Sequence, residues 1–594
     1  MGFPTEPSIW ASTPATGSDY TPGVAPEGYV ACAAPPFLDV DFYKVGHVHQ
    51  YPTGTTVVYS NMTPRNDKHA EAKMNPRVWD YKAVVFGLQA FIKEYLIDTW
   101  NRDFFQRPWS HVEYEYRESV DTGLNTVLDI SHLKALHTLG YLPVEIRALP
   151  EGIRVGMKIP VFTIHNTLPE FYWLTNALET VLSNETWKPM VAATIAANYR
   201  ATAEYWSQVN GSPDYMLQWG CHDFSSRGMS GRWDSRACGM AHLLAFTGTD
   251  TVSAIHAARL LYNAEPRRHF VGGSVPATEH SVMCIDGSDK EFDTYVRLLA
   301  LYTSGIVSIV SDTYDFWQVI TMFTRRLYDT IMAREGRVVF RPDSGNPLDI
   351  ITGTAITVPG VDRNTLTNWL LDNGHTRPEG KTVVCDGSFY RVVRHPIDKG
   401  DGRDWHYYTG ELLDSAIVPP EVKGAYYCLY EVFGGAKNSK GFIDLDPHVG
   451  LIYGDSITPQ LYDAILKRLT DMGFSHSNLV VGVGSYTYQY VTRDTLGAAV
   501  KATYGAVKGV GRAIIKDPKT DPGKKSATGL LVVQAEGGDY KLLDGILAEP
   551  TEVMGGNFGS GELVPTFRNG QLLVDETLSN MRARLGWSDA YPAA

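Results

Sequence analysis

Short runs of apolar, β-branched residues recur through the middle of the chain, and a polar loop follows each of them. The runs lie at residues 243–246, 305–310, 337–340, 449–453 and 479–481. Segments with apolar residues at helical spacing lie between them, at residues 251–262, 316–332 and 459–472. Strands that alternate with helices favour parallel connectivity, and a succession of such units predicts an α/β barrel. We therefore expect the polar loops after these strands to meet at one mouth of the barrel.

The two ends of the chain show a different pattern. Residues 143–164 alternate as strands joined by a turn, and short strand patterns return at residues 530–534 and 540–543. Residues 86–100 carry apolar side chains at the spacing of an amphipathic helix. Because both ends are rich in strand patterns, we predict that they pack together in one sheet-rich α+β domain.

These patterns divide the chain into three parts and one insertion. Residues 1–36 are rich in Pro, Gly, Ser, Thr and Ala, which predicts a flexible N-terminal extension. Residues 37–185 with residues 495–594 form the predicted sheet-rich domain, and residues 186–494 form the predicted irregular α/β barrel. Residues 353–447 interrupt the barrel pattern over a length that is unusual for a connection. We interpret them as an insertion of small elements, a hairpin-rich lid over the mouth or at the edge of a subunit interface.

Composition narrows the class of protein. The 594 residues carry a formal net charge of -13, which argues against a nucleic-acid binder because such proteins need clustered Lys and Arg. The six cysteines form no Cys-x-x-Cys pair, so neither a zinc site nor a disulfide framework is indicated. No signal-peptide pattern is present, and no apolar run approaches the roughly 18 residues of a membrane span. We expect a soluble, cytoplasmic protein without a membrane partner.

The polar loops carry residue types that suit a phosphorylated sugar. Carboxylates on these loops suit ribose hydroxyls and Mg²⁺, and the backbone amides of residues 482–485 suit a phosphate. The adjacent Glu279 and His280 lie on a loop of small residues, where such a pair fits a structural hydrogen bond as well as catalysis. No P-loop motif appears, so an NTPase of that class is not expected.

A series of motifs in this order resembles the nicotinamide phosphoribosyltransferase family. The motifs lie at residues 222–228, 248–251, 274–281, 311–312, 341–347 and 516–518. The resemblance extends from about residue 38 to the C-terminal region, apart from the insertion. It implies a type II phosphoribosyltransferase fold and a homodimer with shared active sites. It also implies an NAD salvage reaction in which nicotinamide and phosphoribosyl pyrophosphate give nicotinamide mononucleotide and pyrophosphate.

The resemblance further implies roles for individual residues. The nicotinamide ring would lie between Phe224 and Tyr43 of the neighbouring subunit, Asp250 would bind the carboxamide, and Arg227 would lie beside the ring and the phosphate. Further positions for the base, the ribose and its 5′-phosphate are Ser274, Val275, Ser308, Arg341, Gly454, Asp455, Gly484 and Ser485. The phosphate-binding cations would be Arg65, Arg493, Lys501, Lys516 and Lys524.

The same resemblance identifies His280 as a histidine that is phosphorylated from ATP, with Glu279 orienting its imidazole. Phosphorylation of this histidine couples ATP hydrolysis to tighter substrate binding in the family. Asp312 and Asp343 would lie near the ribose and bind Mg²⁺, and they complete the catalytic candidates. The chain departs from the family at residues 485–487, where Ser-Tyr-Thr replaces a run of glycines. The geometry of that phosphate loop is therefore expected to differ.

Two other functions remain open on the same fold. The first is a nicotinate phosphoribosyltransferase, which is disfavoured because a carboxylate such as Asp250 would repel the carboxylate of nicotinate but accept a hydrogen bond from the carboxamide. The second is a binding protein without turnover. The joint presence of His280, Asp312, Arg341 and Asp343 with Asp250 argues against it.

Overall fold

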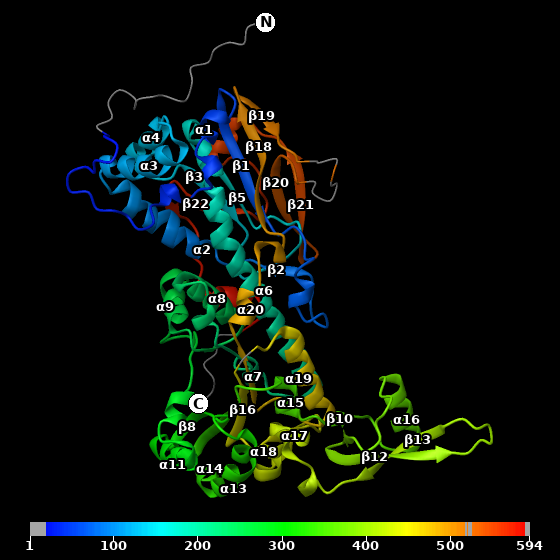
Figure 1. Cartoon of the computed structure of the whole chain (residues 1–594). Helices are drawn as coiled ribbons and strands as arrows, with labels where there is room; N and C mark the ends of the chain where they lie inside the picture. Colours follow the sequence, from blue (N-terminus) through cyan, green and yellow to red (C-terminus); the bar gives the residue numbers. More distant parts are fainter. Residues whose placement is uncertain (1–19, 455, 517–519, 521–525, 588–594) are drawn as a thin grey trace.

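The computed structural model describes residues 20–454, 456–516, 520 and 526–587. Its two largest sheets lie in two separate sheet-bearing parts, and the long helix α6 (Glu179–Asn210) runs from one part to the other (Figure 1). None of the helices in these described ranges has the length and apolar character needed to cross a membrane.

A seven-stranded antiparallel sheet joins the two ends of the chain. Its strands in spatial order are β19 (Val510–Ala513), β18 (Ala499–Val507), β1 (Thr55–Thr63), β5 (Phe162–Asn166), β3 (Val144–Ala148), β22 (Val564–Arg568) and β23 (Gln571–Leu572). In the middle of this sheet, Asn61 pairs with Lys501 and Tyr59 pairs with His165. The prediction of a sheet-rich part built from both chain ends is therefore confirmed.

Helix α3 (Trp109–Leu124) holds the described part of the N-terminal extension. The Tyr20 hydroxyl donates a hydrogen bond to Glu118 at 2.7 Å, and the Tyr29 hydroxyl donates one to Glu115 at 2.8 Å. Glu115 is in turn paired with Arg107, so the helix presents a fixed acceptor. Residues 20–36 differ from the expected flexible extension because these contacts fasten them to α3, and residues 1–19 lie outside the described residues.

The second part is a parallel barrel. Its strands in spatial order are β7 (Gly248–Thr249), β6 (Cys221–Asp223), β17 (Leu479–Val483), β16 (Val449–Tyr453), β9 (Glu335–Arg341) and β8 (Ser304–Val310). Residues 273–278 join the two outer strands: Thr249 N–H donates to the carbonyl of Gly273 at 3.0 Å, and Ser308 N–H donates to that of Pro276 at 2.9 Å. These bonds close the ring, so the predicted irregular α/β barrel is confirmed.

One expectation about an individual element of the barrel is wrong. Residues 243–246, predicted as a strand, include the last residues of helix α8 (Arg232–Ala245), and β7 begins only at Gly248. A short apolar run cannot distinguish a buried helix end from a buried strand, because both need apolar side chains on all sides. His222 and Asp223, which begin the polar motif at residues 222–228, lie in strand β6. The predicted helices at residues 251–262 and 459–472 are confirmed as α9 (Val252–Leu261) and α19 (Pro459–Asp471).

The insertion forms a small sheet of its own. The strands of this sheet are β10 (Ile356–Thr357), β11 (Thr382–Cys385), β12 (Ser388–Ile397) and β13 (Trp405–Leu412). The β12–β13 hairpin projects away from the barrel (Figure 1). Arg468, in the last turn of α19, donates to the carbonyl of Ala355, which fixes the insertion at the end where the barrel strands begin. The insertion therefore does not cover the mouth of its own barrel as the lid hypothesis expected.

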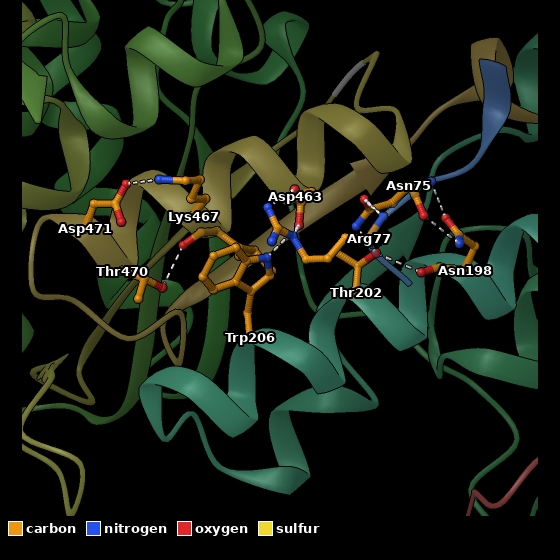
Figure 2. Close-up of polar contacts among 10 residues, drawn as sticks. Asn75, Arg77, Asn198, Thr202, Trp206, Asp463, Lys467, Thr470 and Asp471 are labelled. Atoms are coloured by element: carbon orange, nitrogen blue, oxygen red, sulfur yellow. Dashed lines mark hydrogen bonds and ion pairs between the residues drawn. The ribbon is translucent and has the colours of Figure 1, made fainter. Parts of the chain in front are cut away.

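A polar cluster ties residues 75–77 to two barrel helices, as Figure 2 shows. The Arg77 guanidinium donates to Asp463 of α19 at 2.9 Å, and the indole of Trp206 on α6 donates to the same carboxylate at 2.8 Å. The backbone N–H of Asn75 donates to the side chain of Asn198 on α6 at 2.7 Å. These bonds join residues 75–77 of the first sheet-bearing part to both α6 and α19. They therefore fix the orientation of that part against the barrel.

Candidate active site

The loops after the parallel strands carry most of the predicted site residues, and all these loops lie at the same end of the barrel. Arg227 follows β6, Asp250 follows β7 and Asp312 follows β8. Asp343 follows β9, Gly454 follows β16 and Gly484 follows β17. The segment that closes the barrel adds Ser274 and Val275 at the same mouth. Residues far apart in the chain thus converge as the barrel prediction required.

Asp250 is held by two donors on one of its oxygens. His222 Nε2 lies 2.9 Å from Asp250 Oδ1, and the Ser274 hydroxyl donates to the same oxygen at 2.6 Å. Burial acts to raise the pKa of Asp250, but the hydrogen bonds from His222 and Ser274 and the nearby charge of Arg341 lower it below its usual range. Asp250 therefore presents an ionised carboxylate at the mouth.

Phe224 forms an aromatic wall next to this carboxylate. Its ring centroid lies 4.6 Å from that of His222, and the ring is partly buried. A Cβ atom on Gly482 would lie 2.5 Å from Phe224 Cδ2, so a glycine is required for the ring to lie across β17. An aromatic face beside a carboxylate suits a flat ligand that carries a hydrogen-bond donor.

The expected phosphate loop lies beside Arg227. Gly484 precedes the short helix α20 (Ser485–Gln489), and a Cβ atom on Gly228 would overlap the hydroxyl of Ser485. Arg227, the residue before Gly228, is exposed. The backbone and hydroxyl of Ser485 provide donors for an anion, and the exposed guanidinium of Arg227 belongs to the residue just before Gly228.

His280, Asp312 and Asp343 form a second cluster at the mouth. His280 Nε2 lies 3.3 Å from Asp312 Oδ1, and Asp343 N–H donates to Asp312 Oδ2 at 3.0 Å. The His280 side chain is 48% exposed, whereas that of Asp312 is 6% exposed. Glu279 was expected to orient this imidazole, but its carboxylate accepts a hydrogen bond from Ser281, and the imidazole contacts Asp312 instead.

Arg341 and Ser308 lie behind these loops. Arg341 Nη2 donates to the carbonyl of Thr278 at 2.7 Å, while its buried Nε has no acceptor among the described residues. Ser308 is buried and uses its backbone to bind the segment that closes the barrel. Arg341 therefore places a positive charge beside Asp250, whereas the backbone of Ser308 helps to form the barrel wall.

The remaining predicted residues lie on the other sheet-bearing part. Tyr43 is 66% exposed, and its ring contacts His47 of its own chain at 5.3 Å between centroids. Helix α1, which begins at His47, lies far from α20 in Figure 1, so one chain does not bring Tyr43 to its own Phe224. Four of the predicted phosphate-binding cations are exposed on this part: Arg65, Arg493, Lys501 and Lys516. The predicted residues Asp455 and Lys524 lie outside the described residues.

The carboxylates at the mouth fit a magnesium ion only in part. Both oxygens of Asp312 already accept hydrogen bonds, whereas Asp343 is exposed beside Gly454. Among the described residues no group of three or more His, Cys, Asp or Glu side chains could hold a metal. Magnesium commonly keeps its waters and binds through one or two carboxylates plus substrate phosphates, and Asp343 suits that mode.

A cavity of about 620 Å³ lies elsewhere, at the C-terminal end of α6. Its lining includes Arg200, Glu204, Tyr215, Lys440 and Trp587, none of which belongs to the predicted site. The barrel mouth is the candidate active site because the convergent polar groups lie there, and cavity size alone does not outweigh them.

His222 and Gly482 lie in stretches that the sequence singled out, but their contacts at the mouth were not predicted. His222 was read only as part of a polar motif, although alternation along β6 would have placed it on the face opposite to Cys221 and Asp223. Gly482 lies in the stretch expected to bind a phosphate, but no local pattern predicts that it makes room for the Phe224 ring from another strand.

The chain is similar to proteins of known families. Residues 219–544 match the nicotinate phosphoribosyltransferase (NAPRTase) family, and residues 37–122 match the nicotinamide phosphoribosyltransferase N-terminal domain. The chain is 44% identical to the nicotinamide phosphoribosyltransferase of Acinetobacter baylyi, over 93% of this chain and 97% of that relative. It is 29% identical to the protein of the same name from Xanthomonas campestris pv. campestris, over 92% and 97%.

The solved structures of similar fold include human nicotinic acid phosphoribosyltransferase, with a TM-score of 0.46, 13% identity and 92% coverage of each chain. The matches to the family and to the Acinetobacter relative span most of the chain, including every described loop of the mouth. The chain therefore belongs to the nicotinate phosphoribosyltransferase family, as an enzyme of the nicotinamide phosphoribosyltransferase type that transfers a phosphoribosyl group in NAD salvage.

Proposed function

We propose that the enzyme transfers the phosphoribosyl group of phosphoribosyl pyrophosphate to nicotinamide, giving nicotinamide mononucleotide and pyrophosphate. The observation that carries this choice of base is the Asp250 carboxylate beside the Phe224 ring. An ionised carboxylate accepts hydrogen bonds but cannot donate them, so it suits the NH₂ group of a carboxamide and repels a carboxylate. The names of the two relatives, both nicotinamide phosphoribosyltransferases, support the same substrate.

The chemistry needs an oriented base and a stabilised leaving group. Attack of the ring nitrogen on C1 of the ribose forms a C–N bond while the bond to pyrophosphate breaks, and the electron pair leaves with the pyrophosphate. Phe224 and Asp250 fix the base, which lowers the entropic part of the barrier. Arg227, which is exposed, would donate to phosphate or ribose oxygens, and Arg341 would add positive charge behind them.

Magnesium would be held by Asp343 together with phosphate oxygens of the substrate. When bound, it would neutralise part of the charge that develops on pyrophosphate. Asp312 would serve mainly to hold His280 and the backbone of Asp343, because both of its oxygens are engaged there.

ATP is proposed to act through phosphorylation of His280. The side chain is 48% exposed, so a phosphoryl donor can reach it. In the neutral imidazole, Nε2–H donates to Asp312 and the ring lone pair lies on Nδ1. Attack of this nitrogen on the γ-phosphate of ATP would form an N–P bond and release ADP. The resulting charge beside Asp343 would attract the magnesium that accompanies pyrophosphate.

A homodimer with shared sites is proposed from the division of the site residues. Tyr43 and the exposed cations Arg65, Arg493 and Lys501 lie on a different sheet-bearing part from Phe224. A second copy of the chain could bring them to the mouth, where Tyr43 would cover the other face of the base. The six cysteines are all free, which supports a reducing, cytoplasmic setting.

One assay tests these proposals together. Purified enzyme is given phosphoribosyl pyrophosphate with nicotinamide or nicotinate, with and without ATP, and mononucleotide is quantified by chromatography. We expect turnover of nicotinamide, loss of that turnover by at least about 100-fold in Asp250→Ala, and loss of the ATP benefit in His280→Ala. Turnover of nicotinate but not nicotinamide would overturn the choice of base. An unchanged ATP effect in His280→Ala would overturn the phosphohistidine.

A further inference from the structure

His222 faces the mouth from the middle of β6, although it is no part of the predicted site. Side chains alternate along a strand, so His222 points away from the face that carries Cys221 and Asp223. The Asp223 carboxylate is satisfied on its own side by the hydroxyls of Ser225 and Thr251. His222 instead reaches Asp250 across the neighbouring strand.

The imidazole of His222 is confined by its neighbours. The Phe224 ring lies 4.6 Å away between centroids at an interplanar angle of 36°. A Cβ atom on Gly248 of β7 would lie 2.8 Å from His222 Nδ1, so only glycine allows the ring this close to the strand. The side chain is 9% exposed. Packing therefore fixes the direction in which Nε2 points.

Because His222 and Ser274 both bind the same oxygen of Asp250, its two carboxylate oxygens have different roles. Both donors bind Oδ1, at 2.9 Å and 2.6 Å, while Oδ2 accepts no hydrogen bond from the described part of the chain. The Asp250 side chain is 46% exposed, so Oδ2 is accessible to a ligand. One oxygen is thus fixed by the protein, and the other remains available as an acceptor.

We propose that His222 is a positioning residue that determines the choice of base by holding Asp250 with Oδ2 turned toward the carboxamide. The role rests on the proposed use of nicotinamide. Without the donor from His222, the carboxylate can turn about its side-chain bonds and accepts a proton more readily. A protonated Asp250 no longer repels a carboxylate, so the discrimination against nicotinate weakens as well.

Two variants of His222 separate the donor from the ring. His222→Phe keeps a flat ring and removes the donor, whereas His222→Gln keeps an N–H donor close to the place of Nε2. We expect His222→Phe to raise KM for nicotinamide about tenfold or more, with a much smaller change in kcat and in KM for phosphoribosyl pyrophosphate. We expect His222→Gln to recover most of the loss. In His222→Phe, the preference for nicotinamide over nicotinate should fall by the same factor by which KM for nicotinamide rises.

A double-mutant cycle tests whether His222 acts through Asp250. If it does, His222→Phe adds no further loss to an Asp250→Ala enzyme, whereas independent roles would give additive losses. Additive losses would overturn the positioning role. So would an equal rise in KM for both substrates accompanied by a lower melting temperature, because that result shows a general effect on folding.

The wild-type enzyme separates this inference from the proposed function. If it converts nicotinamide and His222→Phe keeps both the wild-type KM and the preference for nicotinamide, the positioning role is wrong and the proposed function stands. If the wild-type enzyme makes no mononucleotide from nicotinamide, the proposed function is wrong, and the role of His222 in choosing that base falls with it.

Discussion

His280 and Asp312 lie in contact at the mouth of the barrel, with 3.3 Å between the imidazole Nε2 and the carboxylate Oδ1. The two residues are 32 positions apart, and the other carboxylate oxygen of Asp312 binds the backbone of Asp343. A histidine proposed to carry a phosphoryl group is therefore linked through one buried carboxylate to the loop proposed to bind magnesium.

Asp312→Asn should weaken the link between ATP and turnover. The amide cannot accept hydrogen bonds on both sides, so either His280 or the Asp343 backbone loses its partner. We expect the stimulation by ATP to fall about tenfold, together with a loss of basal turnover. The measurement is mononucleotide formation with and without ATP. Asp293→Asn, whose side chain is 67% exposed on α11 (Glu291–Leu301), is the control. Full ATP stimulation in Asp312→Asn would contradict the proposed link.

Gly482→Ala should weaken the binding of the base more than it lowers the stability of the fold. The added methyl would lie 2.5 Å from Phe224 Cδ2 and 2.8 Å from the carbonyl oxygen of Gly454, so the ring must move. We expect KM for nicotinamide to rise about tenfold, because a misplaced ring loses its stacking contact. Gly156→Ala is the matched control, since its Cβ would have no atom within 4 Å. Equal kinetics in the two variants would argue against Phe224 as the wall of the base site.

Mixing two inactive variants tests the shared site. Tyr43→Ala and Asp250→Ala are each expected to lose nicotinamide turnover. If the site takes Tyr43 from one chain and Asp250 from the other, a mixed dimer holds one site with both substitutions and one intact site. After subunit exchange of equal amounts, about a quarter of the sites are intact. Co-expression with two different tags provides the sample. A mixture with no recovered activity, although mixed dimers are isolated, would contradict the shared site.

His476 should make the fold sensitive to acid. Burial lowers its pKa from 6.5 to about 3, and it contacts Asn210 Nδ2 at 3.1 Å through Nδ1. Between these two pKa values the unfolded chain binds a proton that the folded chain does not, so stability falls as pH falls below 6.5. For His476 alone, the free energy of unfolding is lower by about 2 kcal/mol at pH 5, because its pKa in the unfolded chain is 6.5.

The His476→Gln variant removes this dependence. Its melting temperature is expected to lie below that of the wild type at pH 7.5, with a smaller difference at pH 5. The exposed His256→Gln variant controls for the loss of an imidazole. A difference between His476→Gln and the wild type that stays constant from pH 7.5 to pH 5 would contradict a buried, neutral His476.

Much of the barrel follows from the sequence alone. The β-branched runs predicted β8, β9, β16 and β17, because burial of a strand requires apolar side chains at every position of a short local run. The motifs also identified Asp250, Asp312 and Asp343 on loops at the ends of strands, since the order of strand and loop along the chain is local information. The strand patterns at both chain ends predicted that the ends pack together, although the predicted strands β20 (Leu530–Glu536) and β21 (Asp539–Ile546) form a separate two-stranded sheet.

The tertiary structure alone decided how those pieces meet. Residues 273–278 include Ser274 and lie just before His280. They have no strand pattern, yet their backbone closes the barrel between β7 and β8. The tertiary structure also brings His222 into contact with Asp250 and places the insertion away from the mouth of the barrel in the same chain. Hydrogen bonds and close approaches between distant segments leave no trace in local periodicity, so only the folded chain reveals them.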